Sequence, residues 1–88
     1  MAKKGNKKPA GAPRKLTGPQ RAKATREMAG RLAAARRESG LTQAAAARAV
    51  RLSPSLVSRI ERGERRLDPL ELARFARLYG KSIVDFIA

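Results

Sequence analysis

Apolar side chains recur every three or four residues in several segments of this chain, with polar residues between them. The first such segment predicts a helix over 19–38, and Pro19 suits its first position. Its inward face is formed by Met28, Leu32 and Ala35, which are spaced as i, i+4 and i+7. No segment alternates apolar and polar residues as a half-buried strand does, so the chain is predicted to be all-α.

Two short helices are predicted next, with only a few residues between them. Thr42 is a good N-cap for a helix over 43–50. Ser53 is an N-cap for a helix over 54–61, and Pro54 suits the first position of that helix. The second of these helices is amphipathic and basic, and such a pair with a short connection is typical of a helix-turn-helix.

Two further helices complete the predicted fold. Asp68 and Glu71 occupy the N-cap and N3 positions of a helix over 69–78, in a capping-box arrangement. A short final helix follows Ser82 by the same capping logic. The apolar residues of these helices and their connections give the expected core, which comprises Leu32, Leu41, Val50, Leu52, Val57, Ile60, Leu67, Leu72, Phe75, Leu78, Tyr79, Ile83 and Phe86.

The charge of the chain is strongly unbalanced. Its 88 residues suit one small domain, yet its net charge is +14. Residues 1–21 carry seven basic residues and no acidic one, whereas residues 22–88 carry fourteen basic and seven acidic residues. Such an excess indicates a polyanionic partner: a nucleic acid, an anionic membrane or an acidic protein. Nothing in the chain approaches the ~20 apolar residues that span a bilayer, and no membrane association is expected.

The basic N-terminal segment differs in composition from the rest of the chain. Residues 1–18 consist mainly of lysine, glycine, proline and alanine and cannot bury enough apolar surface to offset the entropy of ordering. We therefore expect a disordered arm over 1–18 and a folded domain over 19–88. The arm either lies along phosphates or acts as a solubilising tail. Its candidate phosphate contacts are Lys3, Lys4, Lys7 and Lys8.

The residue types that most enzymes use are missing. The chain contains no cysteine and no histidine, so it has no disulfide, no thiolate nucleophile and none of the usual zinc ligands. Its acidic residues are dispersed, and it has no glycine-rich phosphate loop. An enzyme, a metal site and a bound cofactor are therefore not expected. The lack of cysteine also favours a reducing, intracellular setting.

The stretch LTQAAAARAVRLSPSLVSRIERG, residues 41–63, resembles the helix-turn-helix of the Cro and phage-repressor type, the XRE-like or lambda-repressor-like family. The resemblance extends over about residues 28–87. It implies a five-helix lambda-repressor-like domain that binds double-stranded DNA in a sequence-specific way. It also implies a regulator of transcription, which we expect to be a repressor in the cytoplasm, on the nucleoid, of a prokaryote or phage. The matching positions, without a gap, are Leu41, Thr42, Gln43, Ala47, Leu52, Ser53, Val57, Ser58, Ile60, Glu61 and Gly63.

The resemblance also assigns roles to matching positions. The helix over 54–61 would be the recognition helix in the major groove. Gln43, at the amino end of the preceding helix, and Arg62 would contact DNA phosphates. Arg36 and Glu61 would form an ion pair between the first and third helices. The positions that would face the bases are Pro54, Ser55, Ser58 and Arg59.

The chemistry of these side chains supports some roles independently. Arg59 can bond O6 and N7 of guanine together, so it is the best candidate for base discrimination. Arg65 and Arg66 follow the recognition helix as candidate phosphate contacts, although a solvated loop would carry the same residues. Leu56 either packs against Ile60 in the core or contacts a thymine methyl group.

Two positions depart from the family pattern. Arg51 replaces the turn glycine, and such a turn needs a positive φ that costs a non-glycine residue about 1 kcal/mol. Either Arg51 accepts this strain or the turn differs; its charge also makes it a candidate phosphate contact. Ala46 replaces the family's bulky leucine, which removes several methylene groups from the core.

The sequence alone leaves open the oligomeric state of the protein and the identity of its partner. Proteins of this kind gain affinity by dimerising on a palindromic operator, so we expect a homodimer. Ile83, Phe86 and Ile87 either supply that interface or close the core. The alternative functions are an antitoxin that represses its own operon and binds a partner toxin, and a non-specific architectural binder of nucleic acid.

Overall fold

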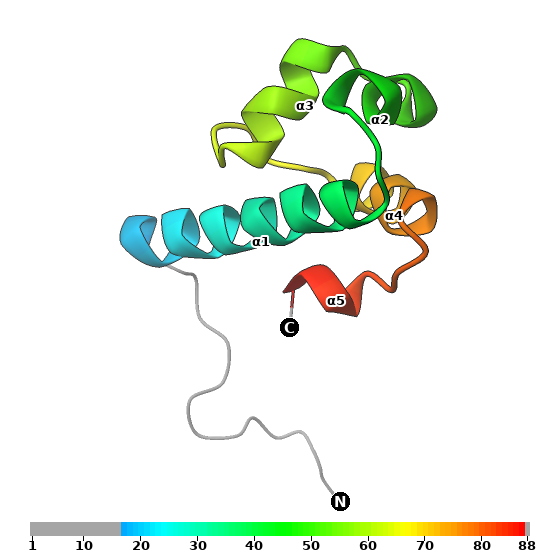
Figure 1. Cartoon of the computed structure of the whole chain (residues 1–88). Helices are drawn as coiled ribbons and strands as arrows, with labels where there is room; N and C mark the ends of the chain where they lie inside the picture. The colour runs from blue at the N-terminus through cyan, green and yellow to red at the C-terminus, as the bar shows by residue number, and fades with distance from the viewer. Residues whose placement is uncertain (1–16, 88) are drawn as a thin grey trace, which may run out of the picture.

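The computed structural model describes residues 17–87, and in that range it contains helices and no strand. The predicted all-α fold of five helices is confirmed (Figure 1). The expected arm contacts Lys3, Lys4, Lys7 and Lys8 lie outside the described residues. The helices are α1 (Gly18–Glu38), α2 (Gln43–Val50), α3 (Pro54–Glu61), α4 (Pro69–Leu78) and α5 (Val84–Ile87).

The long helix α1 begins one residue before the predicted start because Thr17 is its N-cap. The Thr17 hydroxyl accepts a hydrogen bond from the Gln20 backbone N–H at 3.1 Å. In return, the Gln20 side chain accepts one from the Thr17 backbone N–H at 3.0 Å, which completes a capping box. Gly18 and Pro19 therefore both lie inside the helix.

The helices are arranged around α1. In Figure 1, α2 and α3 lie on one side of α1, and α5 lies on the other. Direct contacts join α1 to α3 and to α5, while α2 contacts both α3 and α4. The N-terminal half of α1 extends beyond α2 and runs past the turn that follows α3 (Figure 1). The arrangement leaves one long side of α3 without a covering helix.

The core follows the predicted apolar pattern at most positions. Its largest fully buried side chains are Leu32, Val57, Ile60, Phe75 and Phe86. Four other predicted members are only partly buried and pack against its edge, namely Leu41, Leu52, Leu67 and Leu78. The prediction was wrong for Ile83, which is 38% exposed. It precedes the four-residue helix α5, which turns only Phe86 into the core.

Small side chains fill much of the remaining interior. Six of the fourteen buried apolar residues are alanines: Ala29, Ala33, Ala35, Ala46, Ala47 and Ala76. Of these, Ala35 was predicted on the inward face of its helix. Ala46 is fully buried, and its helix α2 contacts α3 and α4. The helices thus approach closely where the family carries a bulkier residue. No helix within residues 17–87 is long and apolar enough to cross a membrane.

Candidate nucleic-acid interface

The turn between α2 and α3 keeps the geometry that a glycine would adopt. Arg51 has φ 63° and ψ 41°, and it is the only non-glycine residue with positive φ within residues 17–87. The Leu52 N–H donates to the Ala47 carbonyl at 2.9 Å, which ends α2 in a Schellman-like turn. Arg51 thus accepts the left-handed conformation, and its side chain is exposed. Such a conformation costs an L-residue about 1 kcal/mol.

Local capping and core packing fix the orientation of α3. The Ser53 hydroxyl accepts a hydrogen bond from the Leu56 N–H at 3.1 Å, and Pro54 occupies the first turn. Val57 and Ile60 are buried against the core. The opposite side of the helix therefore faces outward. On this side Ser55 and Arg59 are exposed and Ser58 is partly exposed. Pro54 is exposed at the start of the helix, and Leu56, one turn before Ile60, is partly exposed at the border of the buried side.

The candidate base contacts differ in how freely they can act. No hydrogen bond or ion pair joins the Arg59 side chain to another residue within the described part of the chain. By contrast, the Ser58 hydroxyl accepts a hydrogen bond from Arg62. The geometry therefore leaves Arg59 available for a base and engages Ser58 within the protein.

Arg62 is held by a neighbouring carboxylate as well. Its Nε and Nη2 donate to the two carboxylate oxygens of Glu64, each at 3.1 Å. These bonds lower the pKa of Glu64 and raise the pKa of Arg62 from their ordinary values. Both side chains are about half exposed, so water screens the pair. Arg62 can therefore exchange Glu64 for another anionic partner at small cost.

A polar network joins α3 to α1 and α2. Arg36 donates to both carboxylate oxygens of Glu61, from Nε at 2.8 Å and from Nη2 at 3.1 Å. Its Nη1 donates to the Leu41 carbonyl at 2.8 Å, and its hydrogen bonds to Glu61 raise its pKa above the ordinary value. These are the two residues that the family resemblance pairs. The ion pair fixes the end of α3 against α1.

Gln43 belongs to the same network. Its Nε2 donates to Oε1 of Glu61 at 3.0 Å, so Glu61 orients this side chain at the start of α2. An amide NH₂ group has two N–H donors, and this bond uses one of them. The other N–H remains for a phosphate. The sequence suggested Gln43 as a phosphate contact and gave no sign of its bond to Glu61.

The segment after α3 turns closely past α1. Gly63 has φ 75°, and a Cβ atom placed on it would lie 3.2 Å from Cγ of Arg26. The backbone conformation therefore favours glycine, and a larger residue would also crowd Arg26. Sequence reasoning did not single out Arg26, because only the folded chain brings α1 beside this turn.

Arg65 and Arg66 have different environments. Arg65 donates from Nη1 and Nη2 to the two carboxylate oxygens of Glu71, each at 3.2 Å, and is partly buried. Glu71 also accepts from the Asp68 N–H at 3.1 Å in the capping box of α4. Arg65 therefore holds the loop on α4. Arg66 is exposed and forms no ion pair within the described residues.

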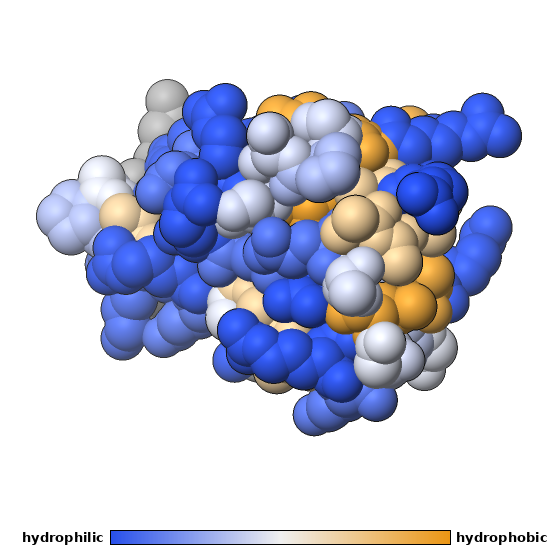
Figure 2. Space-filling view, turned by 45° about the horizontal axis from the view of Figure 1, so that its top comes forward, coloured by the Kyte–Doolittle hydropathy of each residue, from blue (hydrophilic) through white to orange (hydrophobic). Residues whose placement is uncertain are grey.

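The surface around α2 and α3 is predominantly hydrophilic. Figure 2 shows this side of the molecule turned toward the viewer: hydrophilic residues cover most of it, and apolar residues gather toward the right of the view. The exposed arginines of α2, its turn and α3 are Arg48, Arg51 and Arg59. A capped, outward-facing helix after a tight turn, within five helices of this order, defines a helix-turn-helix domain.

Comparisons with known proteins agree with this class. A model of the helix-turn-helix domain family matches residues 27–85, and the chain belongs to this family. Two crystal structures of the clp gene regulator ClgR from Corynebacterium glutamicum share 28% identity with it, with TM-scores of 0.69 and 0.68. Each match covers 72% of this chain, and 67% and 82% of the respective ClgR chains.

A third structure supports the fold alone. The DNA-binding domain of BldD is 23% identical, with a TM-score of 0.69, over 76% of this chain and 97% of that one. No curated protein matches the chain in sequence. The predicted resemblance to lambda-repressor-like helix-turn-helix regulators is thus confirmed by the family and by the structural neighbours.

Proposed function

We propose that this protein is a transcriptional regulator that binds double-stranded DNA with α3 in the major groove. The observation that carries the proposal is the fixed orientation of α3. Val57 and Ile60 hold one side in the core, and Arg59 projects from the other without a partner among residues 17–87. Membership of the helix-turn-helix family and the likeness to a protein described as a gene regulator support the same function.

The base-reading role falls on the exposed side of α3. Arg59 bonds guanine, because a guanidinium can donate to O6 and N7 together. Ser55 lies one turn earlier and is exposed, so it reaches a neighbouring base pair. Pro54 offers an apolar contact at the tip. Ser58 contacts a base only when its hydrogen bond from Arg62 is broken.

Phosphate contacts position the domain on the duplex without reading sequence. Gln43 lies at the start of α2, and Arg62 lies directly after α3. Gln43 is hydrogen-bonded to Glu61, and Arg62 is hydrogen-bonded to Glu64. Arg51 and Arg66 add exposed charges at the two ends of α3. Arg65 contributes its positive charge to phosphate binding while it stays hydrogen-bonded to Glu71.

The proposal includes a homodimer that represses by occupying a palindromic operator on the nucleoid. Phe86 is buried and closes the core, so it is not available for an interface. Ile83, just before α5, and Val84, its first residue, are 38% and 57% exposed. The helix α5 lies on the side of α1 opposite to α3 (Figure 1). These two side chains are the candidate dimer contact. Half-sites would then lie one helical turn apart, about 34–36 Å.

Selection of bound sequences from a pool of random duplexes tests the proposal. We expect one enriched motif with two-fold symmetry and a stoichiometry of two chains per site. Equal binding of the unselected pool and the selected motif would show a non-specific binder instead. A motif without symmetry, bound by one chain, would contradict only the dimer. Deleting residues 1–16 gives a separate test of the basic arm, because lost phosphate contacts make the salt dependence shallower.

A further inference from the structure

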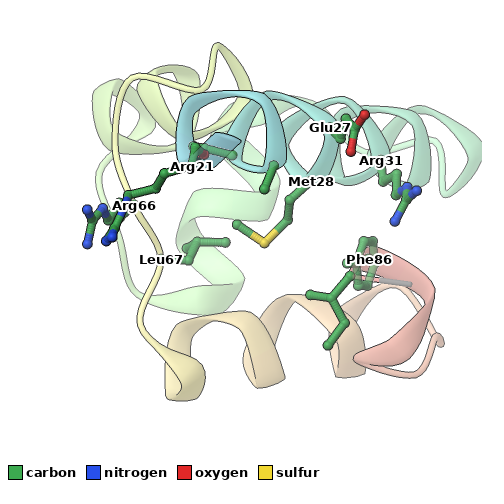
Figure 3. A pocket seen from close by; sticks show the side chains of 10 residues that line it. Arg21, Glu27, Met28, Arg31, Arg66, Leu67 and Phe86 are labelled. Carbon is green, nitrogen blue, oxygen red and sulfur yellow. Dashed lines mark hydrogen bonds between the residues drawn. The ribbon is translucent and has the colours of Figure 1, made fainter. Parts of the chain in front are cut away.

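A groove that shares only Arg66 with the DNA-binding proposal runs along the other side of α1. It has a volume of about 360 Å³ and lies between α1, the segment before α4, and α5 (Figure 3). Its inner surface is apolar: Met28 and Leu67 point into it, and Phe86 closes one end. All three belong to the core or pack on its edge. The groove therefore exposes parts of Met28 and Leu67, at the edge of the core.

Arginines surround this apolar surface. Figure 3 shows Arg21 and Arg66 together at one end and Arg31 near Phe86 at the other. None of these three forms an ion pair within residues 17–87. The one acidic residue at the rim, Glu27, lies 3.8 Å from the Lys23 ammonium group. The rim thus carries three arginines against one glutamate.

We propose that this groove binds an acidic amphipathic helix of a partner protein. Apolar side chains on one face of such a helix would cover Met28 and Leu67. Carboxylates beside that face would pair with Arg31 at one end and Arg66 at the other. An amphipathic helix that places the apolar side chains of one face into a groove is a recurrent mode of peptide recognition. Complementary charge would set the partner's orientation and speed its association.

Other occupants fit the groove less well. A second copy of this chain would bring two cationic rims together, in a protein of net charge +14. The backbone of DNA would present charged phosphates, and not an apolar face, to the floor around Met28 and Leu67. A small amphipathic acid would leave Ile87 uncovered, since this residue lines the groove yet is 60% exposed. The apolar surface thus continues past the groove, which suits a ligand as long as a helix.

The position of the groove connects it to DNA binding. Arg21 and Arg66 also line a smaller cleft of about 230 Å³ beside Gly63 and Arg65, next to the end of α3. A partner that neutralises Arg66 removes a charge from the expected phosphate contacts. The partner would then weaken DNA binding. This last step, unlike the binding itself, rests on the proposed function.

A designed acidic peptide tests the proposal on the full chain. The peptide carries leucines at i, i+4 and i+7 with glutamates on both sides of that stripe, and its control has the same residues in scrambled order. Calorimetry should show binding of the patterned peptide and no binding of the scrambled control. Arg31→Glu should weaken this binding at least about tenfold, because it turns an attractive contact into a repulsive one. The matched variant Arg37→Glu, on an exposed residue of α1 outside the groove, should bind normally.

A second variant tests the apolar surface without truncating the core. Ala24 is exposed and lines the groove, so Ala24→Trp fills it and should abolish binding while the helical circular dichroism is unchanged. Equal binding of the scrambled peptide, or equal losses in Arg31→Glu and Arg37→Glu, would overturn the proposal. So would Arg31-dependent binding of a medium-chain fatty acid, or Arg31-dependent self-association, in place of peptide binding. Competition with duplex DNA is measured separately, so a failure of DNA binding would not be confused with a failure of the groove.

Discussion

Arg36 of α1 donates two parallel hydrogen bonds to Glu61 of α3, at 2.8 Å and 3.1 Å. Their side chains are only 13% and 6% exposed. Glu61 also accepts from Gln43 of α2, so one carboxylate connects three helices. The orientation of α3 is thus set by an ion pair at its carboxyl end as well as by Val57 and Ile60.

Removing this carboxylate should strongly destabilise the domain. Glu61→Ala leaves the largely buried Arg36 without a counter-ion, and breaking such a pair costs about 3–5 kcal/mol. Urea unfolding followed by circular dichroism measures the loss. The control is Glu64→Ala, which breaks the exposed pair with Arg62 and should leave the free energy of unfolding nearly unchanged. Equal effects of the two substitutions would contradict the role of the network.

Arg51→Gly should stabilise the protein by about 1 kcal/mol, since glycine adopts the left-handed conformation without the steric penalty. Thermal unfolding measures this gain. Arg51→Ala removes the same charge but keeps the penalty, so it should not be stabilising. If Arg51 also contacts a phosphate, both variants should lose DNA affinity by the same factor. A gain in stability from alanine as large as that from glycine would show that charge, and not φ, is the cause.

Arg59→Ala should relax base preference at one position of each half-site, because a bidentate contact to guanine discriminates by about 1–3 kcal/mol. Affinities for the selected site and for its single-base variants measure the change. Arg66→Ala is the comparison: it should weaken binding of every sequence equally and reduce the salt slope by about 1. A uniform loss with Arg59→Ala would make Arg59 a phosphate contact instead.

Tyr79 should make the domain sensitive to alkali. Burial, followed by the nearby charge of Glu61, raises the pKa of Tyr79 from 10.0 to about 12. The folded state therefore favours the neutral phenol, and stability that is fully present below pH 10.0 is lost as the pH rises toward about 12. Tyr79 is the only tyrosine, so tyrosinate absorbance follows its ionisation directly.

Tyr79→Phe provides the control, because it retains every lysine and arginine. It should show a smaller fall in unfolding midpoint at high pH than the unmodified protein. The Tyr79 hydroxyl is buried without a hydrogen-bond partner among the described residues, and such an unsatisfied group costs about 1–3 kcal/mol. The phenylalanine variant should therefore be at least as stable at neutral pH. Identical pH profiles for the two proteins would contradict the assignment.

The helices could be predicted closely because their limits are encoded locally. Thr42, Ser53 and Asp68 each cap the helix that follows, through a side-chain bond to a backbone N–H three residues on. The starts of α2, α3 and α4 agree with the prediction. The start of α1 was placed one residue late because Pro19 was taken as its first residue, whereas Thr17 makes the capping box.

The remaining features depend on how distant segments meet. Helical periodicity identifies the outward side of α3, but it cannot show that Ser58 is occupied by Arg62. The bond from Arg65 to Glu71 needs the loop to fold back onto α4. Ile83 was expected inside because it is apolar, although a helix as short as α5 can direct few side chains inward.

The alanines of the interior bear on how long the protein survives in a cell. An alanine buries far less apolar area than a leucine, so a core rich in alanine gains less free energy from burial. A ligand that binds only the folded state adds stability by mass action, about 2.7 kcal/mol at a concentration one hundred times its Kd. Bound operator DNA would supply such stability. Chains on DNA would then resist proteolysis while unbound chains are removed, which links the amount of regulator to the number of occupied sites.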